Sequence, residues 1–290
     1  MSNSDMISIV IPIYNEKDAI GHELDTITKT MEQSGHDYEI IVVDDGSTDG
    51  SADVVRQRES VRLIQHERNL GTGAARTSGT RVAQGSIVVM TDGDGTYPGQ
   101  DIPRLISYLD EYDMVIGART RETGSMRWLR TPAKNFIRWL ACYLTEVAIP
   151  DLNSGLRAFR REIGLKYLPI LPSTHSWVST ITIAFLSDRY RVKWVPIDYY
   201  ERVGRSTFHP IKDTYNYLSL VIRSIMLFNP LKVFLPVSLT LGTIGFVKMI
   251  YDIFTYNFHL APSTVTVILT AVQVGAMGLL ADLIVRRSRL

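Results

Sequence analysis

The sequence predicts an α/β fold with a mostly parallel sheet, followed by an apolar C-terminal segment. Three observations predict it: apolar runs of strand length alternate with helical patterns, two of these runs end in acidic clusters, and charge thins out from Phe234 onward. Alternating strands and helices favour βαβ units, which pair their strands in parallel. Ligands of such sheets lie beyond the carboxyl ends of the strands, where both acidic clusters would lie.

The alternation is regular to about residue 116 and looser afterwards. A stretch rich in Arg, Gly and Thr at 118–131 predicts a loop, and Pro132 opens a helix that runs to about residue 147. The expected strands are 7–11, 39–43, 61–65, 86–90, 114–116, 156–159 and 192–197, and the expected helices are 17–33, 52–58, 74–83, 102–112 and 177–188.

Composition narrows the classes of function. The chain has 290 residues, 45% of them hydrophobic, and a formal net charge of +1, so no basic field indicates nucleic-acid binding. Cys142 is the one cysteine and lies in an apolar helical pattern, which predicts a packing residue and indicates a reducing compartment. The first six residues are polar, and the first apolar run has strand length, so no signal peptide is expected.

The C-terminal part is predicted to be a membrane segment. Residues 210–230 have the pattern of a helix in the membrane interface, although an ordinary core-packing helix has the same pattern. Two apolar segments, about 233–254 and 261–285, are long enough to span a bilayer, with a buried hairpin of a soluble protein as the alternative. Lys232 precedes them and Arg286, Arg287 and Arg289 follow, so both ends are expected in the cytoplasm.

The domain boundaries follow from these segments. We expect a cytoplasmic catalytic domain over 1–209, an interfacial helix over 210–230 and a transmembrane hairpin over 231–290.

Two acidic clusters mark the expected site. Asp44-Asp45-Gly46 follows one predicted strand, and Asp92-Gly93-Asp94 follows another. Carboxylates at positions i and i+2 can converge on one hard divalent cation, which in turn can hold a diphosphate. The histidines are scattered without the spacing of a zinc site. The chain is therefore expected to be a metal-assisted enzyme that uses a nucleotide.

Five motifs in a fixed order resemble the family-2 inverting glycosyltransferases of the GT-A fold, in particular the branch that acts on polyprenyl phosphates and is similar to dolichyl-phosphate mannose synthase. The resemblance covers essentially the whole chain. The motifs are Ile9-Val10-Ile11-Pro12-Ile13-Tyr14-Asn15-Glu16, Val42-Val43-Asp44-Asp45-Gly46-Ser47-Thr48-Asp49-Gly50, Asn69-Leu70-Gly71-Thr72-Gly73, Asp92-Gly93-Asp94-Gly95-Thr96-Tyr97-Pro98 and Asn153-Ser154-Gly155-Leu156-Arg157.

This resemblance implies roles for the acidic residues and their neighbours. Asp92 and Asp94 resemble the pair that binds Mg²⁺ or Mn²⁺ against the donor diphosphate, with Asp94 the principal ligand. Many relatives carry Gln where this chain has Thr96, so further protein ligands stay open. The residues implied in binding the base, the ribose or the neighbouring phosphates are Pro12, Tyr14, Glu16, Asp45, Gly71 and Arg157.

Two segments rich in basic residues are implied to grip phosphates. Arg119, Arg130 and Lys134 belong to the first, and Arg202, Arg205 and Ser206 belong to the second. Planar guanidinium groups suit bidentate contacts with phosphate. Arg202 is implied to take part in catalysis.

Asp151 matches an acidic position near the reacting centre, where it would orient the sugar or act as a base. An Asx turn after Pro150 is the alternative interpretation.

The expected function is metal-dependent transfer of a single sugar, with inversion, from a UDP- or GDP-linked donor to a polyprenyl phosphate in the membrane. Two alternatives stay open: transfer to another lipid that offers a hydroxyl, and a membrane-anchored subunit that binds nucleotide sugars without catalysis. Self-association of the chain also stays open.

Overall fold

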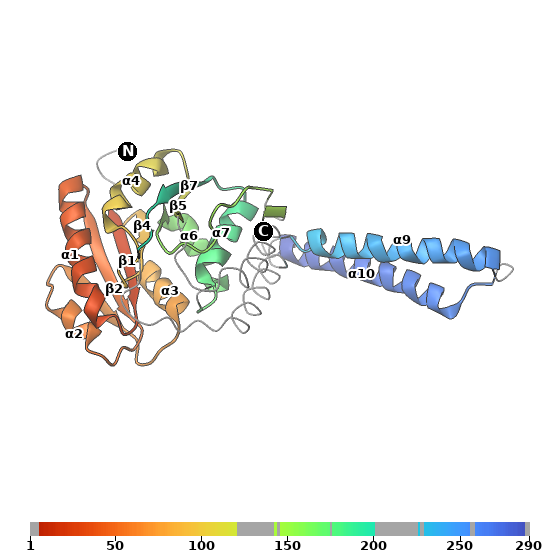
Figure 1. The fold of residues 1–290 in the computed structure, drawn as a ribbon, viewed down its shortest axis with the longest axis horizontal. Helices are drawn as coiled ribbons and strands as arrows, with labels where there is room; N and C mark the ends of the chain where they lie inside the picture. The colour runs from red at the N-terminus through yellow and green to blue at the C-terminus, as the bar shows by residue number, and fades with distance from the viewer. Residues whose placement is uncertain are drawn as a thin grey trace. The chain divides into compact units, whose positions relative to one another are not determined.

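The computed structural model describes residues 6–120, 142–143, 146–174, 176–200, 226, 229–255 and 259–287. They fall into two compact units, one within Met1–Tyr217 and one within Leu218–Leu290. The first unit is an α/β domain and the second is a pair of long helices, as Figure 1 shows.

A seven-stranded sheet forms the centre of the α/β unit, in the order β3-β2-β1-β4-β6-β5-β7. Only β6 is antiparallel to its neighbours β4 and β5, so the expectation of a mostly parallel sheet is confirmed. The strands are β1 (Ile7–Ile13), β2 (Tyr38–Asp44), β3 (Val61–Gln65), β4 (Ile87–Met90), β5 (Met114–Arg119), β6 (Arg157–Arg160) and β7 (Val192–Ile197).

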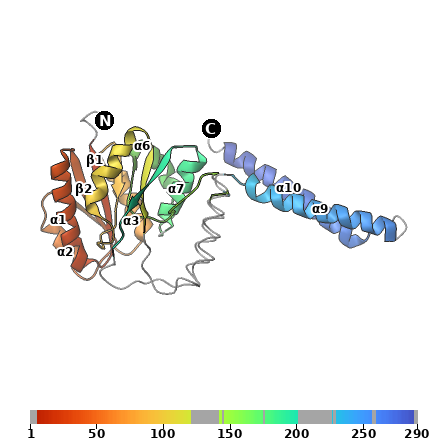
Figure 2. The same ribbon diagram turned by 45° about the horizontal axis from the view of Figure 1, so that its top comes forward.

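Helices cover both faces of the sheet, as the two views of the ribbon show (Figures 1 and 2). Helices α1 (Lys17–Ser34), α2 (Ser51–Arg56) and α4 (Ile102–Ile106) lie on one face. Helices α3 (Thr72–Val82), α6 (Arg161–Tyr167) and α7 (Trp177–Ser187) lie on the other.

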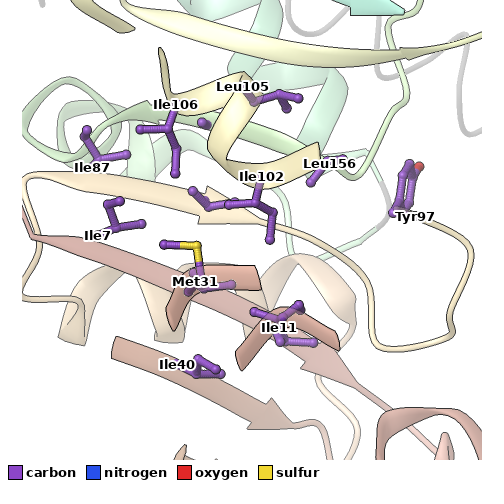
Figure 3. Packing of buried hydrophobic residues seen from close by; sticks show 14 of the residues in the cluster. Ile7, Ile11, Met31, Ile40, Ile87, Tyr97, Ile102, Leu105, Ile106 and Leu156 are labelled. Atoms are coloured by element: carbon purple, nitrogen blue, oxygen red, sulfur yellow. The ribbon is translucent and has the colours of Figure 1, made fainter. Parts of the chain in front are cut away.

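The main core lies between the sheet and α1. Alternate residues of β1, beginning with Ile7, point to this side because side chains of a strand alternate between the two faces. Helix α1 adds Ile20, Leu24, Ile27 and Met31, which lie on one stripe of the helix. Figure 3 shows Met31 packed between the side chains of neighbouring strands and of α4.

Two local predictions differ from the structure. The helix expected at 102–112 is the short α4 followed by a 3-10 turn at Ser107–Asp110. The Ser107 hydroxyl donates to the Arg104 carbonyl at 2.9 Å, and such a side-chain bond competes with the regular helical pattern. Helix α6, which has seven residues, was not expected from the sequence.

The second unit consists of α9 (Leu231–Thr255) and α10 (Pro262–Arg287). Both helices are long and apolar enough to cross a membrane. They pack closely, since a Cβ on Gly278 would lie 2.5 Å from Phe234 Cβ and one on Gly245 would lie 2.8 Å from Ile268 Cγ1. The expected interfacial helix over 210–230 lies largely outside the described residues.

Polar side chains tie the two helices together where α9 ends and α10 begins. Asp252 is fully buried, and its Oδ2 accepts hydrogen bonds from the Ala261 N–H at 3.0 Å and from the Thr264 hydroxyl. Lys248 Nζ lies 3.0 Å from Thr264 Oγ1 and 3.4 Å from Asp252 Oδ1. Asp252 therefore satisfies a backbone donor just before α10 and a side-chain donor in its first turn.

Candidate active site

The carboxyl ends of β1, β2 and β4 bring three of the five motifs to one edge of the sheet. Strand β1 lies between β2 and β4, and Ile13 at its end pairs with Asp44 at the end of β2. Asp92 and Asp94 follow the end of β4. The topology therefore collects the acidic clusters of the sequence at the edge where ligands of parallel sheets bind.

Asp45 is buried and holds the loop that follows β3. Its carboxylate accepts hydrogen bonds from the backbone N–H of Leu70 at 2.9 Å and of Gly71 at 2.8 Å. His66 Nδ1 lies 2.7 Å from Asp45 Oδ1, and His66 Nε2 lies 2.9 Å from Ser78 Oγ on α3. Sequence reasoning missed His66, because only the folded chain places β3 beside Asp45.

The first two motifs are joined by hydrogen bonds. Asn15 has a positive φ of 56°; its N–H donates to Ser47 Oγ at 2.9 Å, and its Oδ1 accepts from the Thr48 N–H at 2.9 Å. The Glu16 N–H donates to Ser51 Oγ, also at 2.9 Å. These bonds fix the segment that presents the expected base-binding residues.

Two of these expected residues differ in accessibility. Pro12 lies within β1 and pairs with Val43, while Tyr14 beyond the strand end is 44% exposed. Tyr14 therefore presents a ring on which a base can stack. Glu16 is largely buried and begins the turn into α1.

The carboxylates after β4 are held by different partners. Asp92 Oδ1 accepts from Arg76 Nη2 on α3 at 2.5 Å. Asp94 Oδ1 accepts from the Thr96 hydroxyl at 2.6 Å and from the Thr96 N–H at 3.2 Å. Thr96, the departure from the pattern of many relatives, is buried and orients Asp94 through its hydroxyl. Arg76 escaped sequence reasoning, since nothing local links α3 to the turn after β4.

The donor set fits a hard divalent cation that shares its coordination with substrate. Within the described part of the chain, no group of three or more His, Cys, Asp or Glu side chains is arranged to hold a metal. Magnesium is commonly bound through one or two carboxylates together with waters and substrate phosphates. Asp92 and Asp94 fit that arrangement, in which a diphosphate and water would supply the remaining ligands.

A third acidic side chain, missed in the sequence, lies near this pair. Glu23 of α1 is buried, and its Oε1 has no hydrogen-bond partner within the described residues. Burial, together with the smaller effects of the charges of Asp94 and Asp92, raises the pKa of Glu23 to about 8. The sequence carried a signal, because Glu23 interrupts the apolar stripe of α1.

Arg119 and Asp151 form a bidentate ion pair. Arg119 Nε lies 2.7 Å from Asp151 Oδ2, and Arg119 Nη2 lies 2.9 Å from Asp151 Oδ1. Burial by itself would raise the pKa of Asp151, but the hydrogen bonds and charge of Arg119 outweigh it and hold that pKa below its usual value. Asp151 is thus a stable carboxylate, which is a poor proton acceptor near neutral pH.

The sequence predicts that Arg157 contacts the nucleotide or its phosphates, but the structure places its side chain in the interior of the domain. Its side chain is fully buried and donates to the carbonyls of Val178, at 2.7 Å, and of Ser154. The Thr182 hydroxyl accepts a further bond at 2.9 Å. Burial and the nearby Arg76 lower the pKa of Arg157 to about 9. The described contacts of Arg157 therefore join β6, the turn before it and α7.

Five expected site residues stay predictions, because they lie outside the described residues. They are Arg130, Lys134, Arg202, Arg205 and Ser206.

Two family models match the chain. Residues 8–164 match the family described as Glycosyl transferase family 2, and residues 229–286 match the family described as GtrB C-terminal hairpin. The first match spans more than half of the chain and includes the turns that carry Asp45, Asp92 and Asp94.

Two curated relatives of the chain carry different names. The dodecaprenyl-phosphate galacturonate synthase of Rhizobium johnstonii is 26% identical over 304 residues, covering 97% of this chain and 88% of that protein. The undecaprenyl-phosphate 4-deoxy-4-formamido-L-arabinose transferase of Aeromonas hydrophila is 34% identical over 171 residues, covering 56% of this chain and 52% of that protein. The match thus spans about half the length of the Aeromonas protein.

Solved structures share the fold. The glucosyl-3-phosphoglycerate synthase of Mycobacterium tuberculosis, in complex with phosphoglyceric acid, has a TM-score of 0.60 and 23% identity, covering 76% of this chain and 80% of that one. The same synthase in complex with Mn²⁺, UDP and phosphoglyceric acid has a TM-score of 0.60 and 20% identity, covering 76% and 78%. The likeness confirms the expected GT-A fold.

Proposed function

Because the chain belongs to glycosyl transferase family 2, we propose that it transfers one sugar from a nucleoside diphosphate donor to a polyprenyl phosphate, with inversion at the anomeric carbon. A family-2 domain and a GtrB-type hairpin occur together in the chain. The Rhizobium relative, whose name includes dodecaprenyl phosphate, matches 97% of this chain. Both features support an acceptor that resides in a membrane.

The Arg119–Asp151 pair is the observation that favours a phosphate acceptor over a lipid hydroxyl. A hydroxyl must lose a proton as it attacks, which calls for a base, and the depressed pKa of Asp151 makes it a weak one. A phosphate monoester has a second pKa of about 6 and is already largely ionised near neutral pH. Its oxygen forms the bond to the anomeric carbon while the bond to the donor diphosphate breaks, so no proton has to move.

The acidic edge would bind the donor. In this proposal Asp45 and Tyr14 bind the base and ribose, and Asp92 and Asp94 hold Mg²⁺ or Mn²⁺. The cation would neutralise charge on the departing diphosphate. The chain itself would have to hold two phosphate groups together against their repulsion. The positive charge for this would come from Arg119 and from the predicted Arg130, Lys134, Arg202 and Arg205.

The domain plan follows from this function. Residues 1–209 would form the catalytic domain, 210–230 an interfacial helix and 231–290 the membrane hairpin. The positive residues Lys232 and Arg287 flank the two apolar helices, and by the positive-inside rule both flanks would lie in the cytoplasm. The catalytic domain would then meet the acceptor at the cytoplasmic leaflet.

The test is release of nucleoside diphosphate by the detergent-purified full chain. A panel of UDP- and GDP-sugars is supplied with Mn²⁺ or Mg²⁺, with or without undecaprenyl phosphate. We expect release that requires both the lipid phosphate and the cation, and that falls about 100-fold or more in Asp94→Ala.

The Asp151→Asn variant separates the two acceptor classes. If a lipid phosphate is the acceptor, activity falls by about tenfold or less, because Asp151 only orients Arg119. A loss near that of Asp94→Ala, together with turnover on diacylglycerol, would replace the proposal with transfer to a lipid hydroxyl. Nucleotide binding without turnover of any donor would favour a binding subunit.

A further inference from the structure

Asp92 is held from two sides by segments that are distant in the sequence. On one side Arg76 Nη2 of α3 donates to Asp92 Oδ1 at 2.5 Å. On the other side a Cβ added to Gly155 would lie 2.6 Å from Asp92 Oδ2, so the backbone before β6 packs directly against the carboxylate. A glycine at 155 is therefore required for the observed position of Asp92.

The Gly155 backbone is itself fixed. Its N–H donates to the Tyr97 hydroxyl at 2.7 Å, and Tyr97 is buried in the turn that follows Asp94. This bond joins the motif at Asn153 to Arg157 to the motif at Asp92 to Pro98, and both motifs then enclose the Asp92 side chain.

Arg76 is an unusual residue for its place on α3. Its side chain is 4% exposed, and the other buried residues of the helix are small and uncharged: Gly73, Ala75, Gly79 and Thr80. Burying a guanidinium costs several kcal/mol unless an anion offsets it. Arg157 is buried nearby and carries a like charge, which makes the position costlier still. Asp92 is the anion that offsets this cost.

The pair therefore does more than pack the domain. An apolar residue would fill the inward face of α3 at lower cost, whereas Arg76 binds one oxygen of a carboxylate that faces the site and is 27% exposed. The Arg76 Nε has no hydrogen-bond partner within the described residues. The guanidinium donates instead through Nη2, to Asp92.

We propose that Arg76 is a positioning residue that holds Asp92 against Gly155 and offsets its negative charge in the donor site. The proposal deepens the proposed function and rests on it for the identity of the donor. It assigns Asp92 a fixed orientation before the donor arrives, which lowers the cost of ordering the carboxylate during the reaction.

Replacing Arg76 is expected to strengthen cation binding, because a positive charge is lost, and to lower kcat, because Asp92 is no longer held in place. In Arg76→Met the nearby positive charge is lost, so a divalent cation alone should bind about threefold to tenfold more tightly. Asp92 keeps its charge and can still reach a cation, but it loses the fixed orientation that Arg76 gives it against Gly155, so kcat should fall about tenfold or more. A purely structural role would predict weaker cation binding together with weaker activity.

The experiment is a double-mutant cycle on the full chain in detergent. Affinity for Mn²⁺ is measured by electron paramagnetic resonance without donor or acceptor, for wild type, Arg76→Met, Arg76→Lys, Asp92→Asn and the Arg76→Met/Asp92→Asn double variant. The control is Arg81→Met, an exposed arginine in the last turn of the same helix. Values of kcat and KM for the donor follow for each variant.

We expect tighter Mn²⁺ binding in Arg76→Met, an intermediate kcat in Arg76→Lys and wild-type behaviour in Arg81→Met. The double variant should lose no more kcat than the worse single variant, because the two residues act as a unit. If Arg76→Met fails to fold, Arg76→Lys replaces it in the cycle, with the same expectation of non-additive losses.

Additive losses, or unchanged or weaker Mn²⁺ binding in Arg76→Met, would overturn the proposal. The Mn²⁺ measurement uses no lipid, so failure of the chain to glycosylate a polyprenyl phosphate would leave this result readable. The two proposals therefore fail separately.

Discussion

Glu23 is a carboxyl group on the apolar stripe of α1, beside Ile20, Leu24 and Ile27. Burying a charged carboxylate in such a place costs free energy, so the folded chain favours the protonated, neutral form of Glu23. The consequence is a dependence of stability on pH. The folded chain binds the proton of Glu23 more tightly than the unfolded chain, because the folded pKa is about 8 against an ordinary 4.5.

Stability should therefore fall as the pH rises from 4.5 to about 8, since the unfolded chain releases this proton first. We expect the loss to amount to about 2–4 kcal/mol across that range, and to be absent in Glu23→Gln. The measurement is thermal unfolding of both proteins in the presence of a chelator, at several pH values.

Glu32→Gln is the matched control, because Glu32 lies exposed on the same helix. It should follow the wild-type pH profile. Equal pH profiles for wild type and Glu23→Gln would show that the buried carboxyl does not retain its proton in the folded chain.

At the scale of elements, the loop between β3 and α3 is fixed by backbone contacts that exclude any Cβ. Gly71 has a φ of 100°, its N–H donates to Asp45, and an added Cβ would lie 2.3 Å from the Ser173 carbonyl oxygen. The first turn of α3 packs on the same segment, since the Gly73 N–H donates to Ser173 at 2.9 Å. The third motif thus joins Asp45 to the turn before α7.

Gly71→Ala should therefore destabilise the N-terminal unit by about 2–4 kcal/mol, through both the left-handed backbone and the clash. Gly35→Ala is the control, because Gly35 has a φ of 71° but no atom within 4 Å of an added Cβ. It should cost only about 1 kcal/mol. Chemical denaturation of the two variants would measure the difference, and equal losses would mean that the Ser173 segment moves away at little cost.

At the scale of the whole molecule, a family-2 domain is combined with two helices that can cross a membrane. The turn between the helices carries Leu260, which is 43% exposed. If both ends of the hairpin are cytoplasmic as proposed, this turn faces the opposite side of the membrane.

We expect Leu260→Cys, in a Cys142→Ser background, to react with a membrane-impermeant maleimide on intact cells. Lys17→Cys in the same background is the control, since Lys17 is exposed in the N-terminal unit and should react only after permeabilisation. The reverse pattern would invert the proposed orientation.

Much of the architecture was already determined by local sequence. Strands β3 and β7 have the predicted bounds, and the other strands differ by a few residues at their ends, because alternation of buried side chains and turn residues are local signals. The positions of Asp45, Asp92 and Asp94 beyond strand ends followed from the same signals. The antiparallel direction of β6 did not, since direction depends on the path of the chain between strands.

What the tertiary structure alone decided is which charges meet. Arg119 lies 32 positions from Asp151 in the sequence, and Arg76 lies 16 positions from Asp92, so no local pattern relates them. The sequence by itself determined the family motifs, the acidic edge and the two apolar helices. Folding determined that Asp151 is paired, that Arg157 is buried and that Arg76 holds Asp92, because burial and pairing of charge depend on contacts between segments that are distant along the chain.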